Sequence, residues 1–94
     1  MTFTIDLNAD IGEGYDDESI LAFVTSGNIA CGGHTGDQET IARTIGLALN
    51  HDVAIGAHPS YPDRRGFGRR SIKIDPETLL GALKEQLTMI RAVA

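Results

Sequence analysis

The side chains that can do chemistry in this 94-residue chain gather in three short stretches. Asp6, Asn8 and Asp10 lie in the first, residues 28–34 form the second, and His58 ends the third, VAIGAH. Carboxylates and imidazoles transfer protons near neutral pH, and they also bind divalent metal ions. The sequence therefore raises the question of which secondary-structure elements bring these groups together.

Short apolar runs predict three β-strands. Alternation of apolar and polar residues indicates a strand at 3–8, GNIACGG indicates a second, four-residue strand within 27–33, and DVAIGAH indicates a third at 52–58. Helices are predicted between and after them: a short one beginning near Asp16 or Asp17, one within 34–51 and one from Asp75.

The second and third helices carry the clearest local signals. Asp37 is a predicted N-cap, with Thr40 in the position of a capping-box Glu, and Asp75 caps a helix that has Pro76 at its first position. We expect one apolar face on each of these two helices. The residues of these faces are Ile41, Ile45, Ala48 and Leu49 on the earlier helix and Leu79, Leu83, Leu87 and Ile90 on the later one.

Alternating strands and helices predict an α/β fold with parallel strands and right-handed crossovers. Three parallel strands cannot close a barrel and leave two open edges, and the last helix reaches Ala94 without a stop signal. We therefore expect residues 1–94 to be a single α/β unit that forms the N-terminal part of one larger barrel domain.

The C-terminal ends of parallel strands lie on one rim, where barrel enzymes build their sites. Asp6 and Asn8 are two residues apart in a predicted strand, so they should face the same side, which is the barrel interior if Leu7 packs outward against the helices. A buried Asp6 would then need a hydrogen bond, a cation or a histidine as partner. Asp10 and Glu13 follow in ADIGEGY, where either is also a candidate cap for the first helix.

Two histidines and one or two aspartates on this rim suit a divalent metal site, and they equally suit a metal-free acid–base site. His34 follows a glycine-rich turn whose amides can approach a ligand closely, and alone it could simply hold the loop. The ligands would come from separate strands, so no local spacing decides between the two kinds of site.

The segment PDRRGFGRR contains four arginines within seven positions, 64–70. Such arginines can clamp a carboxylate or phosphate, or they can belong to a solvated loop. His51, near the end of the second predicted helix, is expected to be structural. Cys31 adjoins the glycine turn, but nothing singles it out as a nucleophile.

Composition narrows the function classes. The net charge of −5 argues against a nucleic-acid-binding surface, and no run of 18 apolar residues could cross a membrane. The single cysteine excludes an internal disulfide framework and suits a reducing compartment. The N-terminus lacks the basic and apolar regions of a signal peptide, so we predict a cytoplasmic location.

Three motifs carry a family resemblance: DLNADIGEG, SGNIACGGHTGD and VAIGAHPSYPDRRGFGRR. With them the chain resembles the LamB/YcsF family, whose members form the A subunit of the prokaryotic ATP-dependent 5-oxoprolinase. The resemblance covers most of residues 5–70 and implies a (β/α) barrel similar to those of the polysaccharide deacetylase superfamily. Family members are much longer, so this chain would supply the first three βα units.

The resemblance also implies an activity, which is cleavage of the lactam of 5-oxo-L-proline to L-glutamate, coupled to hydrolysis of ATP with its Mg²⁺ counter-ion. Subunits B and C would be the partners. Two alternatives stay open: a metal-dependent amidohydrolase or deacetylase that needs no ATP, and a non-catalytic subunit that binds a small acid.

Within the first interpretation, each rim residue has an expected role. Asp6 and His58 would orient or activate water, and Asp10 and His34 would assist as acid–base groups or metal ligands. The residues expected to bind the substrate are Asn8 and Asn28, through its amide, and Arg69, through its carboxylate or a phosphate.

Overall fold

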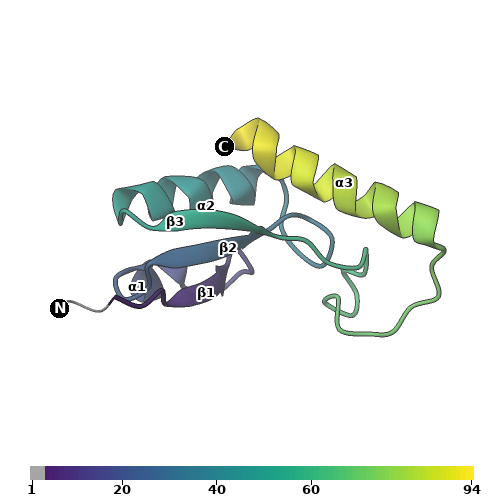
Figure 1. Cartoon of the computed structure of the whole chain (residues 1–94), viewed down its shortest axis with the longest axis horizontal. Helices are drawn as coiled ribbons and strands as arrows, with labels where there is room; N and C mark the ends of the chain where they lie inside the picture. The colour runs from purple at the N-terminus through teal and green to yellow at the C-terminus, as the bar shows by residue number, and fades with distance from the viewer. Residues whose placement is uncertain (1–3) are drawn as a thin grey trace.

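The computed structural model describes residues 4–94 and contains three strands and three helices in strict alternation. They are β1 (Asn8–Ile11), α1 (Asp17–Leu21), β2 (Ser26–Ala30), α2 (Gln38–Asn50), β3 (Ala54–His58) and α3 (Pro76–Val93). The strands form one parallel sheet in the order β1-β2-β3, and the segment 59–75 extends beyond their C-terminal ends (Figure 1). The predicted parallel α/β architecture is confirmed.

One face of the sheet packs against the helices and forms the hydrophobic core. Side chains alternate between the faces of a strand, so Ile11 of β1 and Ile29 of β2 point to the same side. Both are fully buried, together with Ile41 of α2. The remaining members of this core are Leu21, Cys31, Ile45, Ala48, Val53 and Ile90.

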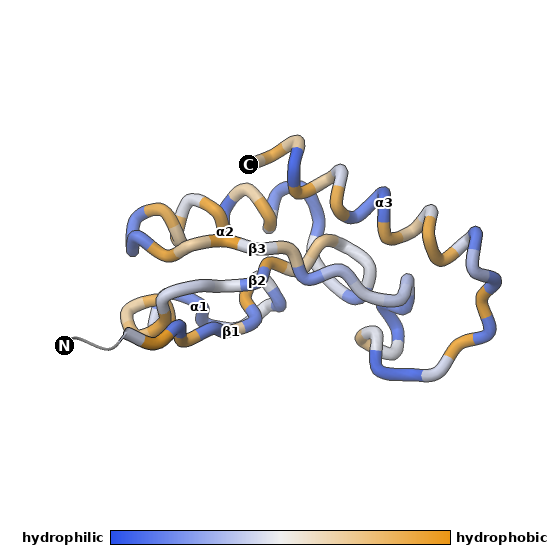
Figure 2. The backbone as a smooth tube through the Cα atoms, in the orientation of Figure 1, coloured by the Kyte–Doolittle hydropathy of each residue, from blue (hydrophilic) through white to orange (hydrophobic). Residues whose placement is uncertain are grey.

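The opposite face of the sheet is polar. Register pairs Asn8 with Ser26 and Asp10 with Asn28, and two residues farther along it pairs Ala30 with His58. These positions alternate with the core residues, so they share the face that the helices do not cover. The tube in Figure 2 is mostly hydrophilic in the segment that follows β3, whereas α2 and α3 mix both kinds of residue along their length.

The bounds of the first strand differ from the prediction. Phe3 lies outside the described residues, and the strand runs over Asn8–Ile11 instead of ending at Asn8. Alternation shows which side chains share a face, but a strand also needs a hydrogen-bonding partner. Because β2 begins at Ser26, which pairs with Asn8, the ladder starts there, and Ile5 remains 81% exposed.

The predicted helix signals are confirmed. Asp37 and Thr40 form a reciprocal capping box on α2, and Asp75 caps α3 with Pro76 in its first turn. The apolar faces are partly wrong: Leu49 is 68% exposed and Leu87 is 45% exposed, whereas the polar Gln86 is buried. A helical stripe read from the sequence cannot say which of its edges meets the neighbouring element. Among residues 4–94, no helix is both long and apolar enough to cross a membrane.

Candidate functional site

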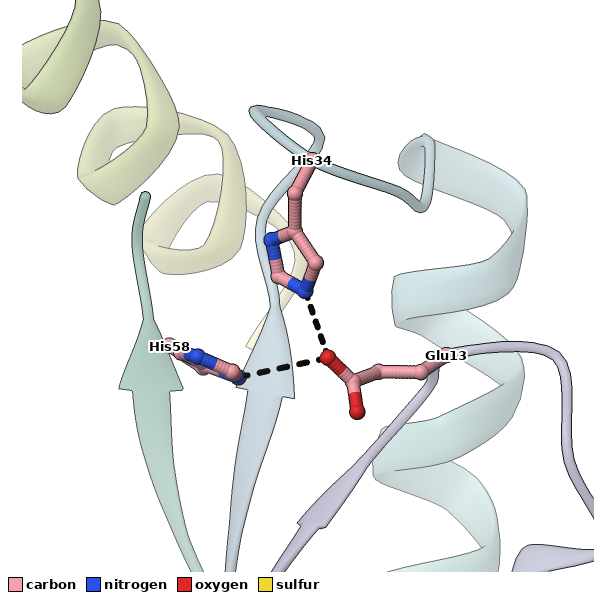
Figure 3. Close-up of side chains that lie close together, drawn as sticks. All are labelled: Glu13, His34 and His58. Carbon is pink, nitrogen blue, oxygen red and sulfur yellow. Dashed lines mark hydrogen bonds and ion pairs between the residues drawn. The ribbon is translucent and has the colours of Figure 1, made fainter. Parts of the chain in front are cut away.

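Glu13, His34 and His58 meet beyond the C-terminal ends of the three strands (Figure 3). Glu13 follows β1, His34 follows β2, and His58 is the last residue of β3. His34 Nε2 lies 2.5 Å from Glu13 Oε2, and His58 Nδ1 lies 3.6 Å from the same oxygen. The imidazole rings are 4.7 Å apart between centroids. The expectation that His34 and His58 share one rim is confirmed.

His34 is held at both ring nitrogens and by an aromatic contact. Its Nδ1 lies 2.9 Å from Ser60 Oγ, opposite the contact of Nε2 with Glu13. Phe67 packs edge-on against the ring with centroids 4.9 Å apart. The residue is only 4% exposed, so its orientation is set by these contacts. His34 can therefore hold the loop and also act in the site, the two roles that the sequence left open for it.

His58 is held less completely. Its Nδ1 is buried from solvent and has no hydrogen-bond partner among residues 4–94, although Asp10 Oδ1 and Glu13 Oε2 are each 3.6 Å away. That separation is too long for a direct hydrogen bond. An unpaired buried polar atom is costly, so the site favours a proton, a water or a cation between the imidazole and the two carboxylates.

The arginine-rich segment folds over the glycine-rich turn that contains His34. The Asp63 backbone N–H donates to the Gly33 carbonyl at 3.0 Å, and Arg64 donates to the Gly36 carbonyl. Asp63 is buried and accepts two hydrogen bonds from Arg70, at 2.6 and 3.1 Å. These bonds, with one from the Gly66 N–H, hold the pKa of Asp63 below its ordinary value.

Phe67 sits at the tip of this segment in the left-handed region, with φ of 55°. Such a conformation is costly for a bulky residue and persists only when surrounding contacts enforce it. Here the enforcing contacts are the Asp63–Arg70 pair at the base of the loop and the His34 ring against which Phe67 packs. The loop thus acts as a structural support for His34.

Gln86 of α3 ties the site to the helical layer. Its side-chain amide donates to the Ser60 carbonyl at 2.8 Å and its side-chain oxygen accepts from the Ser60 N–H at 2.9 Å. Ser60 in turn contacts His34. Sequence reasoning missed Gln86, because a glutamine between Leu83 and Leu87 is typical of an exposed helix position. Only its burial identifies it.

A pocket of about 160 Å³ opens on the cluster. Asp10 and Arg69 line it beside the two histidines, so four of the predicted site residues meet here. The complete lining comprises Asp10, Glu13, His34, His58, Ser60, Phe67, Gly68 and Arg69. Two carboxylates, two imidazoles and one guanidinium around one cavity can exchange protons and can hold an anionic group.

The predicted place of Asp6 in the site is wrong, because the structure places it away from this pocket. It accepts hydrogen bonds from the Thr25 and Ser26 hydroxyls, at 2.5 and 2.8 Å, which hold its pKa below the ordinary value. Ser26 starts β2, four residues before the partner of His58. At about 3.3 Å per residue, that is about 13 Å along the sheet. Asp6 is also exposed, so the expected buried carboxylate is not found.

The two predicted asparagines share the polar face but differ in depth. Asn8 lies at the level of Ser26 and donates to its hydroxyl at 2.8 Å, so it is at the same far end as Asp6. Asn28 pairs in register with Asp10, two residues before the level of His58. Asn28 is therefore closer than Asn8 to the level of the cluster, but neither residue lines the pocket.

Glu13 is the group that the sequence left undecided between a helix cap and a functional role. Asp16 caps α1 instead, accepting from the Ser19 N–H, and Asp17 accepts from the Gly12 N–H at 2.9 Å. The Glu13 side chain is therefore not needed as a cap, and it points toward the two histidines. The sequence did carry a signal for this direction, because Glu13 lies between Gly12 and Gly14. Both glycines take positive φ and turn the chain sharply.

Cys31 is fully buried in the core, and its thiol donates to the Ile29 carbonyl. Burial raises the pKa of this thiol, which disfavours the reactive thiolate. His51 is the C-cap residue of α2 and takes no part in the cluster. Both observations agree with the structural roles expected for these residues.

Known proteins resemble this chain over its whole length. The model of the LamB/YcsF family matches residues 5–94. The chain belongs to the LamB/YcsF family. Relatives in Bordetella pertussis and Bordetella parapertussis, each named as the A subunit of 5-oxoprolinase, are 48% identical over all of this chain. The relative named as 5-oxoprolinase A subunit 1 in Bordetella bronchiseptica has the same identity.

A solved structure gives the same answer for the fold. The lactam utilization protein from Thermus thermophilus superposes with a TM-score of 0.91 at 40% identity, over 97% of this chain. The chain spans 40% of the length of the Bordetella relatives and 39% of the Thermus chain. The observed fold is therefore a part of a larger LamB/YcsF fold, as the open sheet edges led us to expect.

Proposed function

We propose that the protein carrying this chain is a subunit of an ATP-dependent 5-oxoprolinase, which opens the lactam of 5-oxo-L-proline to give L-glutamate. The observation that carries the proposal is the 48% identity, over the entire chain, to relatives named as the A subunit of 5-oxoprolinase. The name lactam utilization protein of the structural neighbour agrees with a cyclic amide as substrate. Subunits B and C are the proposed partners.

The reaction that we propose uses ATP to activate a stable amide. Transfer of the γ-phosphoryl group of ATP to the lactam oxygen releases ADP. Water then adds to the carbonyl carbon that bears this oxygen. The carbon–nitrogen bond breaks while the ring nitrogen takes up a proton, which leaves an acyl phosphate. A second water releases phosphate and completes L-glutamate. Each of these steps needs proton transfer or stabilisation of negative charge.

The pocket supports these needs from this chain's residues. His58 Nδ1, which has no hydrogen-bond partner in the described part of the chain, is the candidate base for the attacking water, with Asp10 3.6 Å away to stabilise the resulting charge. The His34–Glu13 pair can deliver a proton to the ring nitrogen. Arg69 lines the same pocket and is the candidate partner for the substrate carboxylate or a phosphate.

A reconstitution assay tests the proposal. Extract of source cells that lack the protein is supplied with ATP and 5-oxo-L-proline, and glutamate is measured before and after adding the full-length protein. We expect activity to appear with the wild type and with His51→Gln, whose histidine lies outside the cluster, and to fall at least ~100-fold with His58→Gln. No ATP-dependent glutamate formation on adding the wild type would refute the proposal.

The Glu13–His34–His58 cluster also supports a second candidate, an amidohydrolase that does not use ATP. The same assay distinguishes the two. Glutamate or another amide-hydrolysis product formed without ATP, and lost on adding a chelator, would favour the second candidate. A cytoplasmic location stays a prediction, with which the free, buried Cys31 agrees.

A further inference from the structure

The cluster at the strand ends contains donor atoms of the kind and spacing that a metal ion needs. One atom each from Glu13, His34 and His58 lies within 4.8 Å of the other two. Glu13 and His34 come from the connections that follow β1 and β2, His58 ends β3, and the three side chains point toward one another (Figure 3). A carboxylate and two imidazoles are a ligand set that Zn²⁺ takes in catalytic sites, with one coordination position left open.

The hydrogen bonds of His34 favour the tautomer that a metal ligand needs. The Ser60 hydroxyl donates to the Tyr61 carbonyl at 3.0 Å, so its oxygen is left to accept from His34 Nδ1–H at 2.9 Å. In neutral His34 the proton is then on Nδ1, and Nε2 presents a lone pair to the carboxylate of Glu13. Two acceptors facing each other require a proton or a metal ion between them.

His58 gives the second, independent indication. Its Nδ1 is buried without a hydrogen-bond partner among the residues that the structure describes, and it lies 3.6 Å from Glu13 Oε2. Two ligands at about 2.1 Å from one ion in tetrahedral geometry are separated by about 3.4 Å. The observed separation fits shared coordination and does not fit a direct hydrogen bond. His34 Nε2 and Glu13 Oε2, at 2.5 Å, would have to separate by about 1 Å to admit an ion.

Metal-binding histidines are usually held by a hydrogen bond at the ring nitrogen that does not bind the metal, and His34 has such a bond. Ser60 fixes the His34 ring through Nδ1, and Gln86 fixes Ser60 through both of its backbone groups. Asp10 lies 3.6 Å from His58 Nδ1 and lines the same pocket. Asp10 and Glu13 together carry two negative charges, against one positive charge on Arg69 in the same pocket.

We propose that Glu13, His34 and His58 bind one divalent transition-metal ion of the Zn²⁺ class. Mg²⁺ and Ca²⁺ prefer a set of oxygen ligands, so the two imidazoles select against them. The inference goes beyond the proposed lactam reaction and does not depend on it, because it concerns binding to these residues alone. With the ion bound, His58 Nδ1 is a ligand, and Asp10 of the same pocket replaces it as the candidate base.

The test measures binding, not catalysis. The full-length protein is stripped with a chelator, which is then removed, and it is titrated calorimetrically with Zn²⁺ and separately with Mg²⁺. Co²⁺ in place of Zn²⁺ gives a visible spectrum that reports nitrogen and oxygen ligands. We expect one Zn²⁺ per chain, Mg²⁺ binding that is weaker by at least ~100-fold, and a Co²⁺ spectrum that changes with each ligand variant.

Variants assign the site. Glu13→Gln, His34→Gln and His58→Gln should each weaken Zn²⁺ binding at least ~10-fold, and Ser60→Ala about 10-fold or more through the orientation of His34. His51→Gln is the matched control and should bind as the wild type does. Far-ultraviolet circular dichroism verifies that each variant is folded. Absence of stoichiometric Zn²⁺ binding, or binding unchanged in the folded His34→Gln/His58→Gln double variant, would overturn the proposal.

Discussion

Gln86 and Ser60 are joined by two hydrogen bonds that pair a side-chain amide with both polar groups of one backbone residue. The bond lengths are 2.9 and 2.8 Å, and Gln86 is 5% exposed. Since Ser60 also contacts the buried His34, α3 helps to position the candidate site although it supplies no side chain to the pocket.

Replacement of Gln86 by Leu should therefore destabilise the protein. It keeps the bulk of the side chain but leaves the partly buried Ser60 N–H and carbonyl unpaired, at a cost of about 1–3 kcal/mol. Gln86→Glu retains one of the two bonds, so its stability should lie between those of Gln86→Leu and the wild type. Urea unfolding measures the effect, with Gln38→Leu at the exposed start of α2 as control. Equal stability of Gln86→Leu and wild type would contradict this role.

The Asp63–Arg70 pair should make stability depend on acidity. The bonds from Arg70 and Gly66 hold the pKa of Asp63 in the folded protein below its ordinary value of 3.8. The unfolded chain then binds a proton more readily, so the stabilisation is present above that value and is lost as the pH falls through the lower, folded-state pKa. Melting temperatures measured from about pH 6 down to about pH 2 should fall less steeply for Asp63→Asn than for wild type.

Asp63→Asn is also expected to be less stable than wild type near neutral pH, because it loses the ion pair at the base of the loop. The control is Asp52→Asn, whose carboxylate lies in the exposed turn before β3. Parallel pH curves for wild type and Asp63→Asn would show that the pair does not contribute to the acid dependence.

Arg69 should affect substrate affinity more than turnover. If it binds the substrate carboxylate, loss of a charged hydrogen bond costs about 1.5–3 kcal/mol, which raises the KM of Arg69→Ala for 5-oxo-L-proline about 10–150-fold. Arg69→Lys should recover part of this, since an ammonium keeps the charge but not the planar fork. The exposed Arg65→Ala is the matched control. A fall in kcat at unchanged KM would assign Arg69 to another role.

Cys31 should be inert in the folded protein. Its thiol is fully buried, and burial raises its pKa. Alkylation by iodoacetamide at about pH 8 should be slower by on the order of 100-fold than in the urea-unfolded chain, because it requires local opening. Mass spectrometry after timed exposure measures the rate. Rapid alkylation of the folded protein at one site would contradict the burial of Cys31.

The sequence by itself determined the elements whose signals are local. The caps Asp37 and Asp75 and the strand that ends at His58 could be read from a few neighbouring residues, because capping and β-propensity act within one turn or one strand. The parallel order of strands followed from their alternation with helices. It correctly brought His34 and His58 to one rim.

Tertiary structure alone decided which other residues join them. The register of β1 on β2 placed Asp6 beside Ser26, about 13 Å along the sheet from the level of His58, and the turn at Gly12 and Gly14 directed Glu13 toward the histidines. The packing of α3 buried Gln86 in place of Leu87. Each of these outcomes depends on contacts between residues far apart in the chain, and the pattern of one segment carries no information about its partner's register.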